Sequence, residues 1–229
     1  MITTTPAAAR PSLSDVFKDP ATVKLAAAAC AHDEEQARRA VQEGAQLNKG
    51  GVAGATPLHW AFGMCDPEAM SILVKLGADP NFTEPGDDAA GPLVWLAAQK
   101  GRIRELEVLL KAGGDPNTKL GGYTAFLAAI QAGHRDIAEI LLAHGVSING
   151  TALSNGKGAT ALGTAVMNRR FGLGIWLLEN GYTNSPVTEY GLLVDIRDQG
   201  GFFLPSKRAE LAQLLNMMEK RIAALRPTD

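Results

Sequence analysis

The feature that most constrains this fold is a glycine that recurs about every 33 residues. The glycines are Gly44, Gly77, Gly113, Gly145 and Gly181, and four of them are followed, four residues later, by Asn48, Asn81, Asn117 and Asn149. An internal period of roughly 20 to 50 residues is typical of repeat proteins, in which each unit packs only against its neighbours. Because one such unit cannot bury its apolar face alone, the chain is predicted to be an array of stacked units.

Each unit is predicted to be a pair of helices. A helix-start signal lies 21 residues before four of the glycines: Thr56-Pro57-Leu58-His59, Pro92-Leu93-Val94-Trp95, Thr124-Ala125-Phe126-Leu127 and Thr160-Ala161-Leu162-Gly163. A threonine hydroxyl accepts a hydrogen bond from an orphan N–H at a helix start, and a proline in the first helical position loses no bond. A second helix follows a glycine turn, with apolar residues at helical spacing, as in Ile103, Leu106, Leu109 and Leu110. The recurring glycine then closes it in the left-handed conformation.

These residues resemble the ankyrin family. The resemblance is carried by Thr56-Pro57-Leu58-His59-Trp60-Ala61 with Gly77-Ala78-Asp79-Pro80-Asn81, and by Gly133-His134 with Leu141-Leu142-Ala143-His144-Gly145. It covers about residues 21 to 184, and it implies that partners bind in a concave groove formed by loop fingers and the exposed side of the inner helices. It also implies that His59 bonds the backbone of neighbouring turns. The complete Thr-Pro-Leu-His occurs once, which indicates natural, diverged repeats.

The predicted fold class is all-α, an ankyrin-repeat solenoid of about four clear helix-turn-helix repeats with divergent capping repeats at both ends. Residues 1–20 are predicted to be a partly ordered arm, and residues 21–229 a single domain. The domain divides into an N-terminal cap at 21–48, repeats at 49–81, 82–117, 118–149 and 150–184, and a C-terminal cap at 185–229. The caps are predicted to contain helices at 25–31, 34–43, 190–197 and 207–225.

Composition argues against several function classes. A net charge of −2 and a pI near 6.1 give no bulk attraction to nucleic acid or to anionic lipid. No apolar run approaches the roughly 18 residues of a membrane span, and the first residues lack a secretory signal. We therefore expect a cytoplasmic protein, provided that no leader was removed, and its alanine-rich composition suggests a bacterial source. Cys30 and Cys65 are interpreted as reduced packing residues, since two thiols make no disulfide framework.

The sequence predicts no catalytic residue, no cofactor and no metal site. His59 is assigned a structural role, and no Cys or His lies at metal-ligand spacing near His32 or His144. The rival hypothesis is an enzyme that uses Glu189, Asp195 and Asp198 of the C-terminal segment as acids. No nucleophile with a nearby base is recognisable there, so we expect no enzyme.

Partner binding is predicted on the fingers and on the inner helices. Two fingers hold ten residues each, between Asn81 and Pro92 and between Asn149 and Thr160, against seven and six in the other two. Insertions in stacked repeats loop outward, often on the binding face. The candidate residues are Phe82, Glu84, Asp87, Asp88, Tyr123 and Lys157 in fingers, and Met64, Gln99, Lys100, Gln131, Met167 and Asn168 on inner helices. Aromatic anchors beside opposed charges suit a protein partner.

The predicted function is non-enzymatic binding of another protein, as an adaptor or an inhibitor. The alternative is an immunity protein that neutralises a cognate bacterial toxin or enzyme, or an effector aimed at a host protein. We expect the chain to be monomeric by itself, with no nucleic acid, membrane span or small-molecule substrate. The sequence does not identify the partner.

Overall fold

The computed structural model describes residues 11–86, 89–154, 157–184, 187–199 and 204–224. The chain divides into two compact units, which we describe separately. Unit 1 runs to Leu93 and includes Glu107–Gly114, and unit 2 comprises Val94–Leu106 and the residues from Asp115 onward. Helix α7 (Ile103–Lys111) therefore contributes residues to both.

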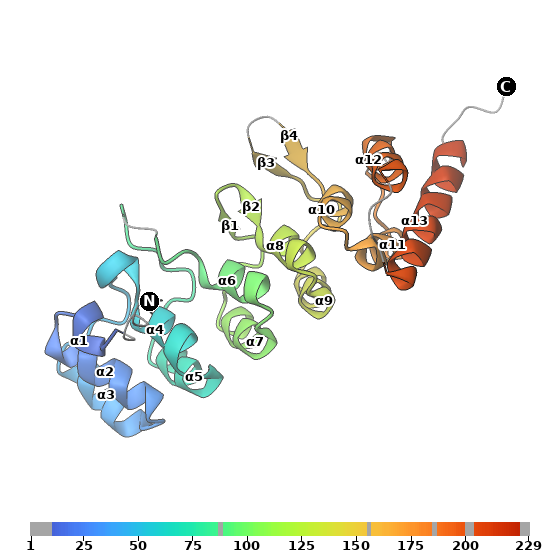
Figure 1. The fold of residues 1–229 in the computed structure, drawn as a ribbon. Coiled ribbons are helices and arrows are strands. Elements are labelled where there is room, and N and C mark those ends of the chain that lie inside the picture. Colours follow the sequence, from blue (N-terminus) through green and yellow to red (C-terminus); the bar gives the residue numbers. More distant parts are fainter. Residues whose placement is uncertain (1–10, 87–88, 155–156, 185–186, 200–203, 225–229) are drawn as a thin grey trace, which may run out of the picture. The chain divides into compact units, whose positions relative to one another are not determined.

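Unit 1 is built from two helix pairs preceded by one short helix (Figure 1). Its elements are α1 (Leu13–Val16), α2 (Pro20–Cys30), α3 (Glu34–Gln42), the 3₁₀ turn η1 (Val52–Gly54), α4 (Pro57–Met64) and α5 (Pro67–Lys75). Helix α2 packs against α3, α4 and α5. The centre of the unit consists of apolar side chains with almost no exposed surface, among them Leu25, Leu58, Met70 and Leu73.

Unit 2 continues the same alternation of inner and outer helices (Figure 1). Its elements are α6 (Leu93–Lys100), α7, β1 (Lys119–Leu120), β2 (Tyr123–Thr124), α8 (Ala125–Ala132), α9 (Arg135–Ala143), β3 (Ala152–Ser154), β4 (Lys157–Ala159), α10 (Ala161–Met167), α11 (Phe171–Glu179), α12 (Val187–Asp198) and α13 (Pro205–Ala224). Helix α8 packs on α9 and α10, and α13 packs on α11 and α12. The predicted all-α repeat fold is confirmed.

Three of the four predicted helix starts are confirmed by capping bonds, and the fourth is confirmed by α6, which begins at Leu93. Thr56 Oγ1 accepts from the His59 N–H at 3.3 Å, Thr124 Oγ1 from Leu127 at 3.2 Å, and Thr160 Oγ1 from Gly163 at 2.9 Å. The recurring glycines all have a positive φ, which is 98° at Gly44, 106° at Gly77, 89° at Gly113, 84° at Gly145 and 91° at Gly181. An L side chain is disfavoured at that φ, so the outer-helix ends require glycine.

The asparagines that follow these glycines join one finger to the next. The Asn48 amide donates to the Gly77 carbonyl at 3.1 Å and accepts from the Asp79 N–H at 2.8 Å. The Asn81 amide donates in the same way to Gly113 O at 2.9 Å. In unit 2, Asn149 Oδ1 accepts from the Thr183 N–H at 2.7 Å. The period of the sequence therefore reflects hydrogen bonds between successive repeats.

Two fingers contain β-hairpins that the sequence analysis did not predict. Strands β1 and β2 pair antiparallel, with Leu120 opposite Tyr123, and β3 and β4 pair with Leu153 opposite Gly158. Strands of two or three residues are too short to show an alternating apolar pattern. The hairpins extend fingers and leave the helical fold class unchanged.

Part of the predicted N-terminal arm is folded against unit 1. Residues 13–16 form α1, and Phe17 is 4% exposed. The Phe17 ring packs edge-on against Trp60, with centroids 6.4 Å apart and planes at 67°. Burial of one aromatic side chain contributes roughly 1.5 to 3 kcal/mol, so residues 13–17 belong to the folded body of unit 1.

The interpretation of the two cysteines as reduced thiols was wrong. Cys30 and Cys65 form a disulfide, with Cα atoms 5.5 Å apart. Cys30 ends α2 and Cys65 is the C-cap of α4, so they occupy related positions in adjacent repeats. Stacking brings such positions within the roughly 4.4 to 6.8 Å that a disulfide spans. Beside them, His32 Nε2 lies 2.9 Å from an Asp66 carboxylate oxygen.

Candidate partner-binding surface

The ends of the inner helices in unit 2 carry exposed long side chains. Gln99 and Lys100 end α6, Gln131 lies near the end of α8, and Met167 ends α10 with 66% of its surface exposed. These residues lie seven or eight positions after the opening residues Pro92, Thr124 and Thr160. The preceding turns of the same helices are buried against the core. Equivalent positions of successive repeats thus present one row of exposed side chains.

Two further inner-helix candidates differ from this row. In unit 1, Met64 ends α4 and is 42% exposed. In unit 2, Asn168 is exposed, but its amide donates to the Thr164 carbonyl at 2.8 Å. Because that bond fixes the side chain against its own helix, Asn168 has one donor fewer for a partner.

In the long finger between Asn81 and Pro92, the carboxylate of Glu84 makes a hydrogen bond within unit 1. Glu84 is half-buried, and its carboxylate accepts the Gly50 N–H at 2.6 Å. A carboxylate held in this way ties one finger to the preceding one. Phe82 is half-buried, and Asp87 and Asp88 lie outside the described residues. The predicted acidic contact with a partner therefore stays a prediction.

Tyr123 is an internal strut as well as a finger residue. It is half-buried, and its hydroxyl lies 2.9 Å from Thr164 Oγ1 of α10. Its carbonyl accepts the indole N–H of Trp95 at 2.9 Å. These bonds connect three successive repeats of unit 2 through one residue. Lys157 lies in β4, and its side chain is outside the described residues.

His59 has the structural role predicted for it. Its Nε2 lies 2.9 Å from the Gly91 carbonyl, which can only accept, so Nε2 carries the proton. Nδ1 then accepts from the Thr56 hydroxyl at 2.8 Å and from the Thr56 N–H at 3.3 Å. Burial lowers the pKa of His59 below 6.5, against the opposing effect of the bond to Gly91. The neutral ring links two turns and presents no free base.

The C-terminal acids of the enzyme hypothesis have separate surroundings. Glu189 is 5% exposed and accepts the Thr160 hydroxyl at 2.6 Å and the Tyr182 hydroxyl at 3.4 Å. Burial raises the pKa of Tyr182 to about 12, and the charge of Glu189 adds to it. Asp195 is exposed, and Asp198 is an exposed acid paired with Arg197 at 2.8 Å. Glu189 is thus bonded inside the fold, whereas Asp195 and Asp198 are exposed on α12.

The side chains and helices of the described residues also bear on metal binding and membrane insertion. No group of three or more His, Cys, Asp or Glu side chains within them could hold a metal ion. Within the same ranges, no helix has the length and apolar character needed to cross a membrane.

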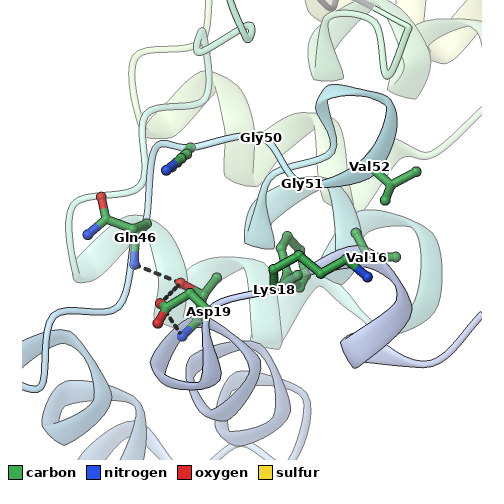
Figure 2. Close-up of a pocket in the computed structure, with 10 residues that line it drawn as sticks. Val16, Lys18, Asp19, Gln46, Gly50, Gly51 and Val52 are labelled. Carbon is green, nitrogen blue, oxygen red and sulfur yellow. Dashed lines mark hydrogen bonds between the residues drawn. The ribbon is translucent and has the colours of Figure 1, made fainter.

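One cavity was missed by the sequence analysis. It lies in unit 1 between the end of α1 and the first finger, which is residues 49–55 (Figure 2). Its lining includes Lys18 and Lys49. No motif in residues 1–20 predicts that this segment forms one wall of a cavity. The one available signal was Phe17, a large apolar residue just before the helix-start residues Asp19 and Pro20.

Two family models match the chain. The model described as "Ankyrin repeats (3 copies)" matches residues 94–187, and the one described as "Ankyrin repeat" matches residues 53–84. Together they cover more than half of the chain. The matched ranges include the capping threonines Thr56, Thr124 and Thr160 and the exposed inner-helix ends.

Proposed function

The chain belongs to the ankyrin-repeat family, and from this premise we propose that it binds another protein through the exposed ends of its inner helices. Ankyrin repeats generally mediate protein–protein interaction and are generally non-enzymatic. The proposed contact surface in unit 2 is made by Gln99, Lys100, Gln131 and Met167.

The observation that carries the proposal is the exposure of this row. Met167 is 66% exposed beside fully buried Val166, so folding removes little of its apolar surface from water. Methionine adapts its shape to a partner surface, and glutamine and lysine supply donors around it. An apolar centre with a polar surround is the usual composition of a protein interface.

An adaptor and an inhibitor differ only in how their binding affects the activity of the partner. An inhibitor covers a surface that its partner needs for activity, whereas an adaptor leaves that activity intact. An immunity protein is the special case in which the partner is a toxin. The identity of the partner and an assay of its activity with and without this chain distinguish the three roles.

The test is capture followed by variants of the row. The immobilised chain is exposed to an extract of its native source, and captured proteins are identified by mass spectrometry. Affinity for the purified partner is then measured with the double variant Gln131→Arg and Met167→Arg. We expect the Kd to rise at least about tenfold, or about 1.4 kcal/mol, because the substitutions place two charges in a desolvated contact.

The control adds a single arginine away from the row. Ala143→Arg places an arginine at the exposed end of the outer helix α9, where a cation suits the helix C-terminus. We expect this variant to bind as the parent does. Unchanged affinity in the double variant, with folding intact, would place the contact elsewhere.

The disulfide bears on the cellular compartment in which the chain binds its partner. Disulfides persist in oxidising compartments and are rare in the reducing cytosol, where we expected this chain. Mass spectrometry of protein alkylated in its native source, before lysis, reports whether Cys30 and Cys65 are joined there. A fully reduced pair supports the cytoplasm, and an oxidised pair supports an oxidising compartment.

A further inference from the structure

The cavity between α1 and the first finger is a concave site of unit 1 that lies apart from the proposed inner-helix surface of unit 2. Its volume is about 390 Å³, within the roughly 300 to 1,000 Å³ of ligand pockets in general. Residues 16–19 and Thr22 form one wall, and Gln46 with residues 49–52 forms the other. Figure 2 shows Val16, Lys18 and Asp19 facing the loop segment that carries Gly50, Gly51 and Val52.

The two walls approach each other closely at Gly51, and hydrogen bonds fix the backbone there. A Cβ atom on Gly51 would collide with the Val16 carbonyl oxygen, and one on Gly50 would lie 2.9 Å from Glu84 Cβ. The Gly50 N–H is fixed by Glu84 at 2.6 Å, and the Gly51 N–H by the Ala55 carbonyl at 2.9 Å. The missing side chain at Gly51 therefore lets the finger pack closely beside α1, and the missing side chain at Gly50 makes room for Glu84.

The interior combines an apolar lining with two cations. Phe17 and Val16 contribute apolar surface, and Val52 stands at the rim with 57% of its surface exposed. Lys18 and Lys49 are exposed lining residues. Neither lies within ion-pair distance of a carboxylate in the described ranges, and Lys18 makes one long contact of 3.5 Å with the Ser14 carbonyl.

The other polar groups of the lining are already used. The Asp19 carboxylate accepts from the Thr22 N–H at 2.9 Å, the Thr22 hydroxyl at 2.6 Å and the Ala21 N–H at 3.4 Å. The same bonds, with the nearby charge of Lys49 as the smallest contribution, hold the pKa of Asp19 below its usual value. Gln46 donates its backbone N–H to Thr22 Oγ1 and its amide to Gly44 O, each at 2.9 Å. The two ammonium groups are thus the principal donors left for an occupant.

We propose that this cavity binds an acidic segment of a partner protein, with a Glu or Asp carboxylate between Lys18 and Lys49 and an adjacent apolar side chain against Val16 and Val52. The charge of the lysines selects the carboxylate, and the apolar lining selects its neighbour. The inference rests on the proposed function and adds a second contact with its own chemistry.

The test uses N-acetyl-Glu-Leu-amide as the probe. It is titrated into the ¹⁵N-labelled full chain, and shifts of the Gly50, Gly51 and Val52 amides are followed by NMR. We expect saturable shifts confined to the cavity, and a much weaker effect of the isosteric N-acetyl-Gln-Leu-amide. In Lys18→Gln with Lys49→Gln, affinity should fall about fivefold to tenfold, because one exposed ion pair changes an equilibrium by up to about fivefold.

Two variants serve as controls. Lys111→Gln removes a lysine from the exposed side of α7, outside the cavity, and should leave the affinity unchanged. Val52→Ser removes only rim apolar surface and should weaken the Leu-containing probe without affecting the fold. Sodium acetate, as a third probe, has the carboxylate without the apolar group and should bind more weakly than the peptide.

Three results would overturn the proposal. They are the absence of saturable shifts, equal affinity for the Gln peptide, and equal affinity for acetate, the last of which would make this a small-anion site. These outcomes leave the proposed function standing, since that depends on Gln131 and Met167. Conversely, a partner that loses affinity with the Gln131 and Met167 variants but binds the lysine variants normally supports the first proposal alone.

Discussion

At the scale of single residues, several side chains that looked available for binding are occupied inside the chain. Glu84 accepts the Gly50 N–H, and the Tyr123 hydroxyl contacts Thr164. Each bond links residues that are 34 or 41 positions apart, which no local pattern reveals. His59 differs, because its role follows from a motif and its bonds to Thr56 and Gly91 agree with it.

Replacing His59 tests that role. We expect His59→Ala to lower the free energy of unfolding by about 1 to 3 kcal/mol, since the Gly91 carbonyl loses its donor in a half-buried turn. Urea unfolding measures the change. Affinity for a partner should stay within about twofold, since the ring faces neighbouring turns. Lost affinity at full stability would overturn the structural assignment.

The same residue predicts a pH dependence. The pKa of His59 lies below 6.5 in the folded chain because of burial, so the unfolded chain binds more protons just below that pH. The stability due to the neutral ring is fully present above pH 6.5 and is lost as the pH falls through the folded pKa. Urea midpoints between pH 7 and pH 5 should therefore fall more steeply for the parent than for His59→Ala. Parallel curves would contradict the prediction.

At the scale of elements, the covalent link between α2 and α4 is the least expected feature. The disulfide joins positions 35 residues apart, and the His32–Asp66 contact lies beside it. Two cysteines in 229 residues suggested no framework, but a repeat places equivalent positions next to each other. The spacing of the two cysteines is close to the repeat period, and that is the signal that could have indicated the bond.

Removing the link should destabilise unit 1. Closing a loop of this length restricts the unfolded chain, so we expect Cys30→Ser with Cys65→Ser to cost about 2 to 4 kcal/mol. Thermal melting of the oxidised parent, the reduced parent and the double variant measures the effect. Reduced parent and variant should melt together, below the oxidised protein. Three coincident melting curves would show that the bond adds no stability.

At the scale of the whole molecule, the last helix closes the array. In α13 the apolar residues Leu211, Leu214, Leu215 and Met218 recur at helical spacing and are buried. Gly174 of α11 leaves room for Leu214, because a Cβ there would lie 2.8 Å from a Leu214 methyl. The terminal helix is thus fitted to its predecessor in shape as well as polarity.

Deleting residues 206–229 tests whether α13 is needed to cover the core. The truncation should expose the apolar face of α11, with a lower melting temperature and aggregation seen by light scattering. Point variants provide a matched pair, because Leu214 is buried and Gln213 is exposed on the same helix. Leu214→Asp should destabilise strongly and Gln213→Asp hardly at all. A truncated chain that stays monomeric with unchanged melting would contradict the prediction.

The sequence by itself determined the repeat, the helix starts and the glycine-closed helix ends. Those features depend on capping bonds and φ preferences within a few residues, as at Thr56, Thr160 and Gly77. Only the tertiary structure decided the Cys30–Cys65 bond, the burial of Phe17 and the internal use of Glu84. Each of these depends on which residues of different repeats or segments come within bonding distance. The stacking of the repeats sets that distance, and a local sequence pattern does not encode it.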